Sequence, residues 1–193
     1  EGQSFRSAGL AFATEAAERL GAIRVSLGWR SGRRSQILAM SHVAKPDRRQ
    51  GLVRAILGAM DEALDQEAVV VLGQGTRDEG PRVTVRHKEL SNTSGPGGPV
   101  ITVPLHGEEG WLGAITAEFP PDRDIGDEDV GLVEAAGLAA ARVLDLRRRD
   151  ERWITTKIAQ SAWTQAGRLL GPGYLGRKLL LLALAAATAF FWV

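Results

Sequence analysis

Histidine and serine are the residue types in this chain that could supply a metal ligand or a nucleophile, and their spacing speaks against both roles. His42, His87 and His106 fall at a strand end, in a loop-rich segment and in a hairpin turn. Metal ligands usually have close helical or hairpin spacing, so these separated positions predict no metal site. No serine, Ser26 and Ser41 included, stands in a Gly-x-Ser-x-Gly context, and no Gly-x-x-x-x-Gly-Lys phosphate loop occurs. The sequence therefore predicts no catalytic constellation, no enzyme activity and no cofactor.

The chain contains no cysteine. This excludes disulfide bonds, thiolate metal sites and cysteine nucleophiles, and it fits a reducing compartment. The apolar fraction of 44% is ordinary for a globular protein, and about 145 residues is a common size for one domain with its own core.

Two predicted strands carry polar residues at alternate positions. Arg24 and Ser26 alternate with apolar residues in the first of these strands, and Thr116 and Glu118 lie near the end of the last one. This period of two places them on the polar face of a sheet. One role for Arg24 and Glu118 is an ion pair at the sheet margin.

The hydrophobic periodicity predicts an order of helix, strand, strand, helix, strand, loop, strand, strand and helix. Asp47 is placed to cap the second helix, and the loop region from Gly73 to Pro99 contains a short possible helix, Val83–Leu90. The other predicted elements are a helix ending at Leu20, strands Ile23–Trp29 and Ser35–Met40, a helix from about Arg48 to Leu64, strands Val69–Leu72, Val100–Leu105 and Trp111–Phe119, and a helix from Asp127 to Leu144.

The C-terminal run Leu179–Val193 contains no charge, glycine or proline. Arg177 and Lys178 stand directly before it, as basic residues often flank a membrane segment, and the run predicts the first part of a transmembrane helix. A buried core helix is the alternative. Residues 147–178 hold eight basic and two acidic residues, which predicts a cytoplasmic flank in contact with membrane lipid. Because the basic residues crowd here rather than along a domain face, nucleic-acid binding is not predicted.

The segment Trp153–Leu170 has its apolar residues on one side of a helix. Such a helix could lie in the membrane interface. The competing interpretation is a dimeric signalling helix, although sustained heptads are absent.

The order of elements, together with the stretch Val103–Thr116, resembles a GAF domain over roughly Phe5 to Arg148. In that family a strand ending in Pro-Leu leads through a turn to Gly-x-x-x-Gly-x-Leu. Here Gly110 and Gly113 stand three apart instead of four, and Ile115 takes the place of the leucine. We expect Gly110 to permit the turn, and Gly113 to leave room where a helix packs against the strand. The predicted fold class is α/β (α+β), a GAF-like antiparallel sheet flanked by helices and followed by an amphipathic helix and a transmembrane helix.

The GAF resemblance implies a small-molecule ligand held between the sheet and the Gly73–Pro99 loops. In that case Arg24, Ser26, Thr116 and Glu118 would line the pocket. The cyclic-nucleotide signature of the family is missing, and bilin attachment or methionine-sulfoxide reduction would need the absent cysteine. The resemblance and the apolar stripes also imply a homodimer through residues 5–20 and 130–144.

A narrower resemblance is to bacterial proteins that fuse a cytoplasmic GAF domain to an HlyD-type membrane-fusion adaptor. It is carried by Arg147–Trp153, Leu169–Gly173 and Gly176–Leu179. It implies three parts: a GAF-like domain over 1–148, a basic amphipathic connector over 149–175, and the start of a membrane helix over 176–193.

The function expected from this resemblance is non-catalytic. The protein would be a sensory or docking domain on the cytoplasmic side of the bacterial inner membrane, anchored by a single pass as the N-terminal part of an export adaptor with export-system partners. The alternative is the ligand-sensing input domain of a membrane-bound kinase or cyclase.

Overall fold

The computed structural model describes residues 2–32, 34–44, 46–47, 50–73, 82–93, 97–108 and 110–145. The predicted connector, the predicted membrane helix and its flanking Arg177 and Lys178 lie outside these residues. Within the described ranges, no helix combines the length and the apolar character that crossing a membrane requires.

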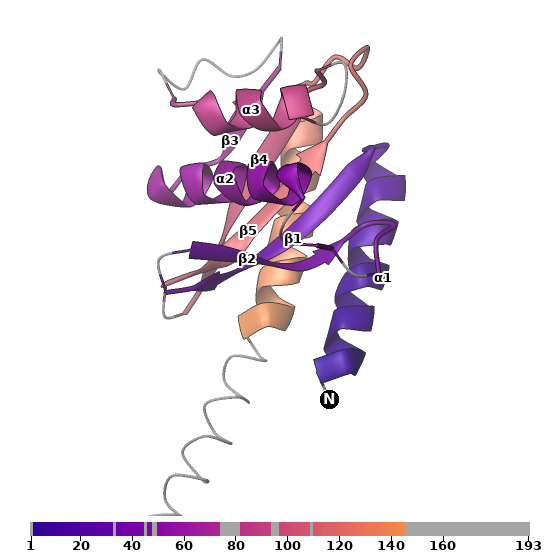
Figure 1. Ribbon diagram of the computed structural model, residues 1–193, viewed down its shortest axis with the longest axis vertical. Helices are drawn as coiled ribbons and strands as arrows, with labels where there is room; N and C mark the ends of the chain where they lie inside the picture. Colours follow the sequence, from indigo (N-terminus) through magenta and orange to yellow (C-terminus); the bar gives the residue numbers. More distant parts are fainter. Residues whose placement is uncertain are drawn as a thin grey trace, which may run out of the picture. The chain divides into compact units, whose positions relative to one another are not determined.

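A single antiparallel sheet of five strands forms the centre of the fold, with the strand order β2-β1-β5-β4-β3 (Figure 1). All four neighbouring pairs are antiparallel, as predicted. The central strand, β5, pairs on one side with β1 and on the other with β4. The strands are β1 (Arg24–Ser31), β2 (Arg34–Met40), β3 (Val70–Leu72), β4 (Val100–Gly107) and β5 (Gly110–Glu118).

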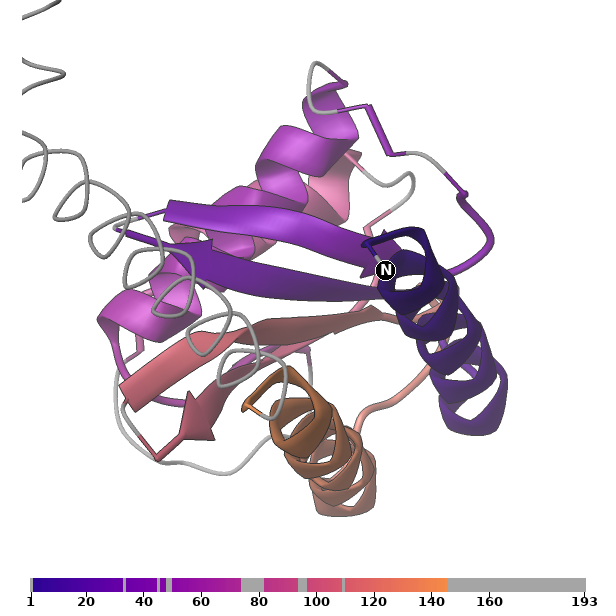
Figure 2. The same ribbon diagram turned by 90° about the horizontal axis from the view of Figure 1, so that it is seen from below.

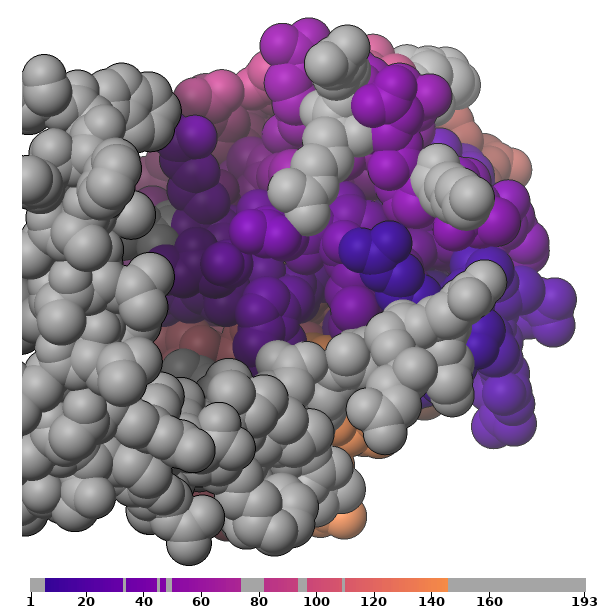
Figure 3. Space-filling model, turned by 60° about the horizontal axis from the view of Figure 1, so that its bottom comes forward, coloured from indigo at the N-terminus to yellow at the C-terminus, as the bar shows by residue number. Residues whose placement is uncertain are grey.

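The helices cover both faces of this sheet (Figure 2). Helix α1 (Gly2–Leu20) and the helix over residues 127–145, drawn in orange, pack on one face. Helices α2 (Gly51–Asp65) and α3 (Val85–Thr93) pack on the other. Helix α1 lies along β1 and β2, and its outer side forms part of the molecular surface (Figure 3).

The layer between the sheet and the pair formed by α1 and the 127–145 helix is apolar. Leu27, Ile115 and Val103 are neighbours across β1, β5 and β4, and all three are buried in it. A buried side chain of this size contributes about 1.5–3 kcal/mol relative to an exposed one. This apolar layer therefore supplies stability.

The α2 side of the sheet approaches its helix closely at one point. A Cβ on Gly28 would overlap the sulfur of Met60, which is fully buried on α2. The glycine in the middle of β1 thus has a packing reason. Ile56 and Leu90 are buried in the same layer, but this layer also contains polar side chains.

Several helix boundaries differ from the sequence expectation, among them the end of α3, which lies at Thr93 instead of Leu90. Helix α2 begins at Gly51 with Gln50 at the cap position, and the Gln50 side chain makes no hydrogen bond to the helix, so, contrary to the prediction, Asp47 is not the cap residue. Helix α3 begins at Val85 instead of Val83, because the side chain of Gln66, the C-cap residue of α2, holds the backbone of Val83 by hydrogen bonds.

The two glycines of the predicted turn motif have different roles. Gly110 has a φ of 114°, so it supplies the turn conformation as expected. At Gly113 a Cβ would overlap the carbonyl oxygen of Gly28 and lie 3.0 Å from the Cα of Trp29. The closest atoms at Gly113 thus belong to the neighbouring strand β1.

Candidate functional site

A row of hydroxyl side chains crosses the sheet on the face that α2 and α3 cover. Ser26 on β1, Thr116 on β5 and Thr102 on β4 are register partners across three adjacent strands. All three are fully buried. A buried hydroxyl without a hydrogen bond costs about 1–3 kcal/mol, so such a row needs partners.

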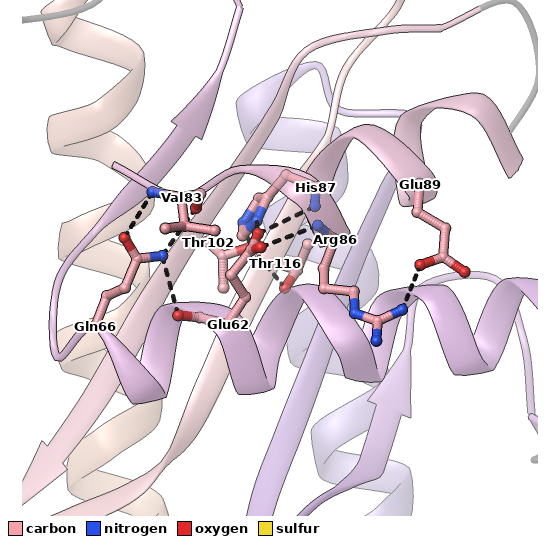
Figure 4. Close-up of polar contacts among 8 residues, drawn as sticks. All are labelled: Glu62, Gln66, Val83, Arg86, His87, Glu89, Thr102 and Thr116. Carbon is pink, nitrogen blue, oxygen red and sulfur yellow. Dashed lines mark hydrogen bonds and ion pairs between the residues drawn. The ribbon is translucent and has the colours of Figure 1, made fainter. Parts of the chain in front are cut away.

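His87 of α3 supplies one of these partners, and it connects the row to α2 (Figure 4). Its Nε2 lies 2.9 Å from the hydroxyl of Thr102, and its Nδ1 lies 2.6 Å from a carboxylate oxygen of Glu62. The hydroxyls of Thr102 and Thr116 are 3.1 Å apart. The four side chains form one continuous hydrogen-bonded chain that runs from α2 through α3 to the central strand.

Glu62 also caps the N-terminus of α3. Its carboxylate accepts the backbone N–H of Arg86 at 3.0 Å and that of His87 at 3.3 Å. The first turn of α3 contains no acidic residue of its own. A carboxylate at the positive end of a helix satisfies free N–H groups and interacts favourably with the helix dipole, so α2 provides the cap that α3 lacks.

Gln66, the C-cap residue of α2 and one turn after Glu62, holds the segment before α3. Its side chain accepts the N–H of Val83 at 3.0 Å and donates to the carbonyl of Val83 at 2.9 Å. Within α3 only His87, Leu90 and Ser91 are buried. The attachment of α3 to the domain thus depends on a few polar contacts and on one apolar side chain.

The protein environment shifts the pKa values of the two ionisable side chains in this hydrogen-bonded row, His87 and Glu62. Burial lowers the pKa of His87, although the hydrogen bond and the charge of Glu62 act in the opposite direction. Burial alone would raise the pKa of Glu62. The hydrogen bonds from Arg86 and His87 outweigh this effect and hold the pKa of Glu62 below its usual value. At neutral pH the imidazole is therefore neutral, with Nδ1–H donating to a charged Glu62 and Nε2 accepting from Thr102.

A carboxylate, an imidazole and a hydroxyl in this order are also the components of a nucleophilic triad. Here the hydroxyl of Thr102 and the ring of His87 are fully buried under α2 and α3. A substrate cannot reach them in this arrangement. In this arrangement the hydrogen-bonded side chains can bind protons and can hold α3 in place.

Arg24, Ser26, Thr116 and Glu118 are brought together as two adjacent cross-strand pairs, Arg24 with Glu118 and Ser26 with Thr116. The guanidinium of Arg24 lies 3.0 and 3.2 Å from the two carboxylate oxygens of Glu118, and the side chains are 17% and 5% exposed. The ion pair considered from the sequence is thus present. The hydroxyl of Ser26 has no hydrogen-bond partner in the part of the chain that the structure describes.

The cavity beside Glu118 has a volume of about 20 Å³, which is room for about one water molecule and too little for an organic ligand. A larger open cleft of about 490 Å³ lies between the 97–99 and 121–124 segments, but none of the four predicted ligand-binding residues lines it. In this arrangement the hydroxyl row is closed off by α2 and α3. The residues lining the small cavity are Ile23, Ser91, Gly97, Gly98, Pro99, Val100, Glu118, Phe119 and Pro121.

Local sequence patterns did not identify Glu62 or Thr102, and they suggested a role for His87 only as a possible metal ligand. The other histidines lie elsewhere: His42 is in an exposed turn, and His106 stacks edge-on against Trp111 with ring centres 4.9 Å apart. Among the residues that the structure places, no group of three acidic or histidine side chains could hold a metal ion. The signal for Thr102 was its alternation with the apolar Ile101 and Val103, which places it on the face of Thr116 once the strand register is known.

The sequence matches no protein-family model and no curated protein. Solved structures do resemble the fold. The GAF domain of an Acinetobacter phosphoenolpyruvate-protein phosphotransferase aligns with a TM-score of 0.54 and 10% identity, covering 77% of this chain and 86% of that domain.

Two further structures also align over about three quarters of this chain. The blue-light absorbing form of the PixJ GAF domain from Thermosynechococcus elongatus aligns with a TM-score of 0.51 and 14% identity, over 79% of this chain and 92% of that one. A domain described as part of a two-component sensor histidine kinase from Sinorhizobium meliloti aligns with a TM-score of 0.50 and 13% identity, over 74% and 91%. These likenesses show that the domain has the GAF fold.

Proposed function

We propose that this GAF-fold domain is a non-catalytic sensory module whose signal acts on the layer between the sheet and α3. The observation that carries the proposal is the buried row of polar side chains leading from Glu62 through His87 and Thr102 to Thr116. Apolar residues would fill this layer at lower free-energy cost. Polar groups in such a place are typical of a site that responds to a ligand or to protons.

The unpartnered hydroxyl of Ser26 supports the same proposal. It lies opposite Thr116 and next to the ion pair of Arg24 with Glu118. A ligand entering beneath α3 would meet two hydroxyls, a guanidinium and a carboxylate on one face of the sheet. Such a set suits a small polar molecule with both hydrogen-bond donors and acceptors.

The names of two structural neighbours favour a signalling context. One is a light-absorbing GAF domain, and the other is described as a domain of a sensor histidine kinase. None of the three structures named above is an export adaptor. We therefore favour the input domain of a membrane-bound signalling protein over the N-terminal part of an HlyD-like adaptor. Attachment to the bacterial inner membrane, with the domain on the cytoplasmic side, stays a prediction from residues 147–193.

Native mass spectrometry of residues 1–149, of which residues 1–145 make one compact unit, tests the proposal. We expect a co-purifying small molecule that is lost when Arg24 and Glu118 are both replaced by alanine. Because the two charges are removed together, neither is left buried without its partner, and the fold should persist by circular dichroism.

The matched control replaces Glu15 and Arg19 of α1, which form an exposed ion pair, by alanine. This variant should keep the bound molecule. If several preparations of the unmodified domain are empty, the ligand-sensing function is wrong, and a role in protein docking or dimerisation takes its place.

We also propose a homodimer through α1 and the 127–145 helix. Leu132 and Val143 are 47% and 54% exposed on the latter helix. Leu132 lines a groove of about 360 Å³ together with Phe12 and Leu20 of α1. Replacing both Leu132 and Val143 by aspartate should convert a dimer of residues 1–149 into a monomer by light scattering.

The control for the dimer is Val85→Asp on α3, which also places a charge at an exposed apolar position and should leave the dimer intact. A parent fragment that is monomeric at high concentration would rule out the dimer.

A further inference from the structure

We propose that α3 is a proton-sensitive latch, which is held closed over the hydroxyl row by Glu62 and His87 and released when the solution becomes acidic. The inference deepens the proposed function, because it states how access to the same site is regulated. It is carried by the geometry with which α3 is attached to α2.

The titratable pair Glu62 and His87 makes most of the polar contacts that attach α3 to the domain. The carboxylate of Glu62 accepts two backbone N–H groups at the start of α3 and the Nδ1–H of His87. The imidazole then accepts from Thr102 on β4. Protonation of either partner removes an acceptor on which α3 depends.

Helix α3 has little apolar packing to hold it in place when these polar contacts are lost. Its surface is mostly polar, and Leu90 is its one fully buried aliphatic side chain. A short helix of this kind is marginal without tertiary contacts. The sheet and α2 have apolar layers of their own and do not need α3 to the same extent.

The stability of the closed state depends on pH, and it falls as the solution becomes more acidic. In the closed state burial lowers the pKa of His87, whereas in an open state the side chain returns to its ordinary value near 6.5. The open state therefore binds more protons below about pH 6.5, and the closed state loses stability as the pH falls. Glu62, whose pKa is lowered in the closed state, acts in the same direction at still lower pH.

Other charged groups around the imidazole do not oppose this effect. Glu62 of α2 is the ionisable group in direct hydrogen-bond contact with it in the described ranges. On β5, Glu118 lies one pair further along the sheet and is engaged by Arg24 of β1. The strand β4 contributes the neutral Thr102. The remaining charged neighbours are solvent-exposed on α3, namely Arg86, Lys88 and Glu89.

Opening of the latch would uncover the site of the proposed function. With His87 withdrawn, Thr102 would lose the ring that covers it and would be uncovered beside α2, and Thr116 and Ser26 follow it in the same row. Protonation would thus change access to the hydroxyl row without any change in the sheet.

Hydrogen exchange of the 193-residue chain in detergent, measured at about pH 7.5 and about pH 5.5, tests the latch. We expect the protection factors of amides in residues 86–93 to fall by up to tenfold per pH unit below about pH 6.5, the limit for one bound proton. Protection of β4 and β5 should stay unchanged. Equal protection of α3 at both pH values would overturn the proposal.

The variant His87→Gln separates titration from structure, because its amide can still donate to Glu62 and accept from Thr102 but does not titrate. Its α3 protection should be independent of pH in this range. The controls His42→Gln and His106→Gln remove exposed histidines and should retain the full pH dependence.

If His87→Gln does not fold, nitrogen-15 NMR of the unmodified chain decides. In the closed state the His87 ring should remain neutral, with its proton on Nδ1, at a pH below the ordinary histidine value of about 6.5. A ring that is protonated while α3 stays closed would overturn the latch. Native mass spectra at both pH values keep the two failures apart: a missing ligand concerns the proposed function, and pH-independent protection concerns the latch.

Discussion

Replacing Gly113 by alanine is expected to lower the free energy of unfolding by about 3 kcal/mol, through overpacking of a site without free space. The added Cβ would overlap the carbonyl oxygen of Gly28 and lie 2.9 Å from its carbonyl carbon. These are backbone atoms of β1, and they cannot move away without disturbing the pairing of β1 with the central strand β5. Equilibrium urea denaturation of the domain measures the loss.

The matched control is Gly131→Ala in the 127–145 helix, where an added Cβ meets no atom within 4 Å. Alanine is also the better helix former, so this variant should be unchanged or more stable by roughly 0.5–1 kcal/mol. An equal loss in both variants, or no loss at Gly113, would contradict the close approach of β1 and β5.

Replacing Glu62 by alanine should have a comparable effect. It leaves the N–H groups of Arg86 and His87 and the ring of His87 without their shared acceptor. Hydrogen bonds to a charged group contribute about 1.5–3 kcal/mol each, and some of the freed groups will find water as α3 loosens. We expect a net loss of about 3 kcal/mol in urea denaturation, with the earliest loss of hydrogen-exchange protection in α3.

Glu89→Ala is the control for this change. Glu89 forms an ion pair with Arg86 at 2.7 Å, but its side chain is 52% exposed. Solvent screening limits such a pair to about 0–1 kcal/mol, so this variant should remain close to the unmodified domain. A large loss in Glu89→Ala, or none in Glu62→Ala, would show that α3 is held in a different way.

The secondary structure follows from local patterns in the sequence to a large extent. The alternation from Ile23 to Trp29 and the apolar spacing up to Leu20 identified β1 and α1, because side-chain direction repeats every 2 residues in a strand and every 3.6 in a helix. The same alternation identified Arg24 and Glu118 as candidates for an ion pair. Helix ends were less well predicted, since the start of α3 depends on Gln66, a residue of another helix.

The tertiary structure alone decided the candidate site. Glu62 and His87 are 25 residues apart, and His87 and Thr102 are 15 apart. Their contact requires the docking of α3 on α2 and the register of β4 with β5, and neither leaves a signal in a local window of sequence. Gly113 is a second example. The atoms nearest to it are backbone atoms of β1, which every residue type has, so no sequence pattern marks this close contact. Local periodicity thus determined which elements form, and long-range packing determined which side chains meet.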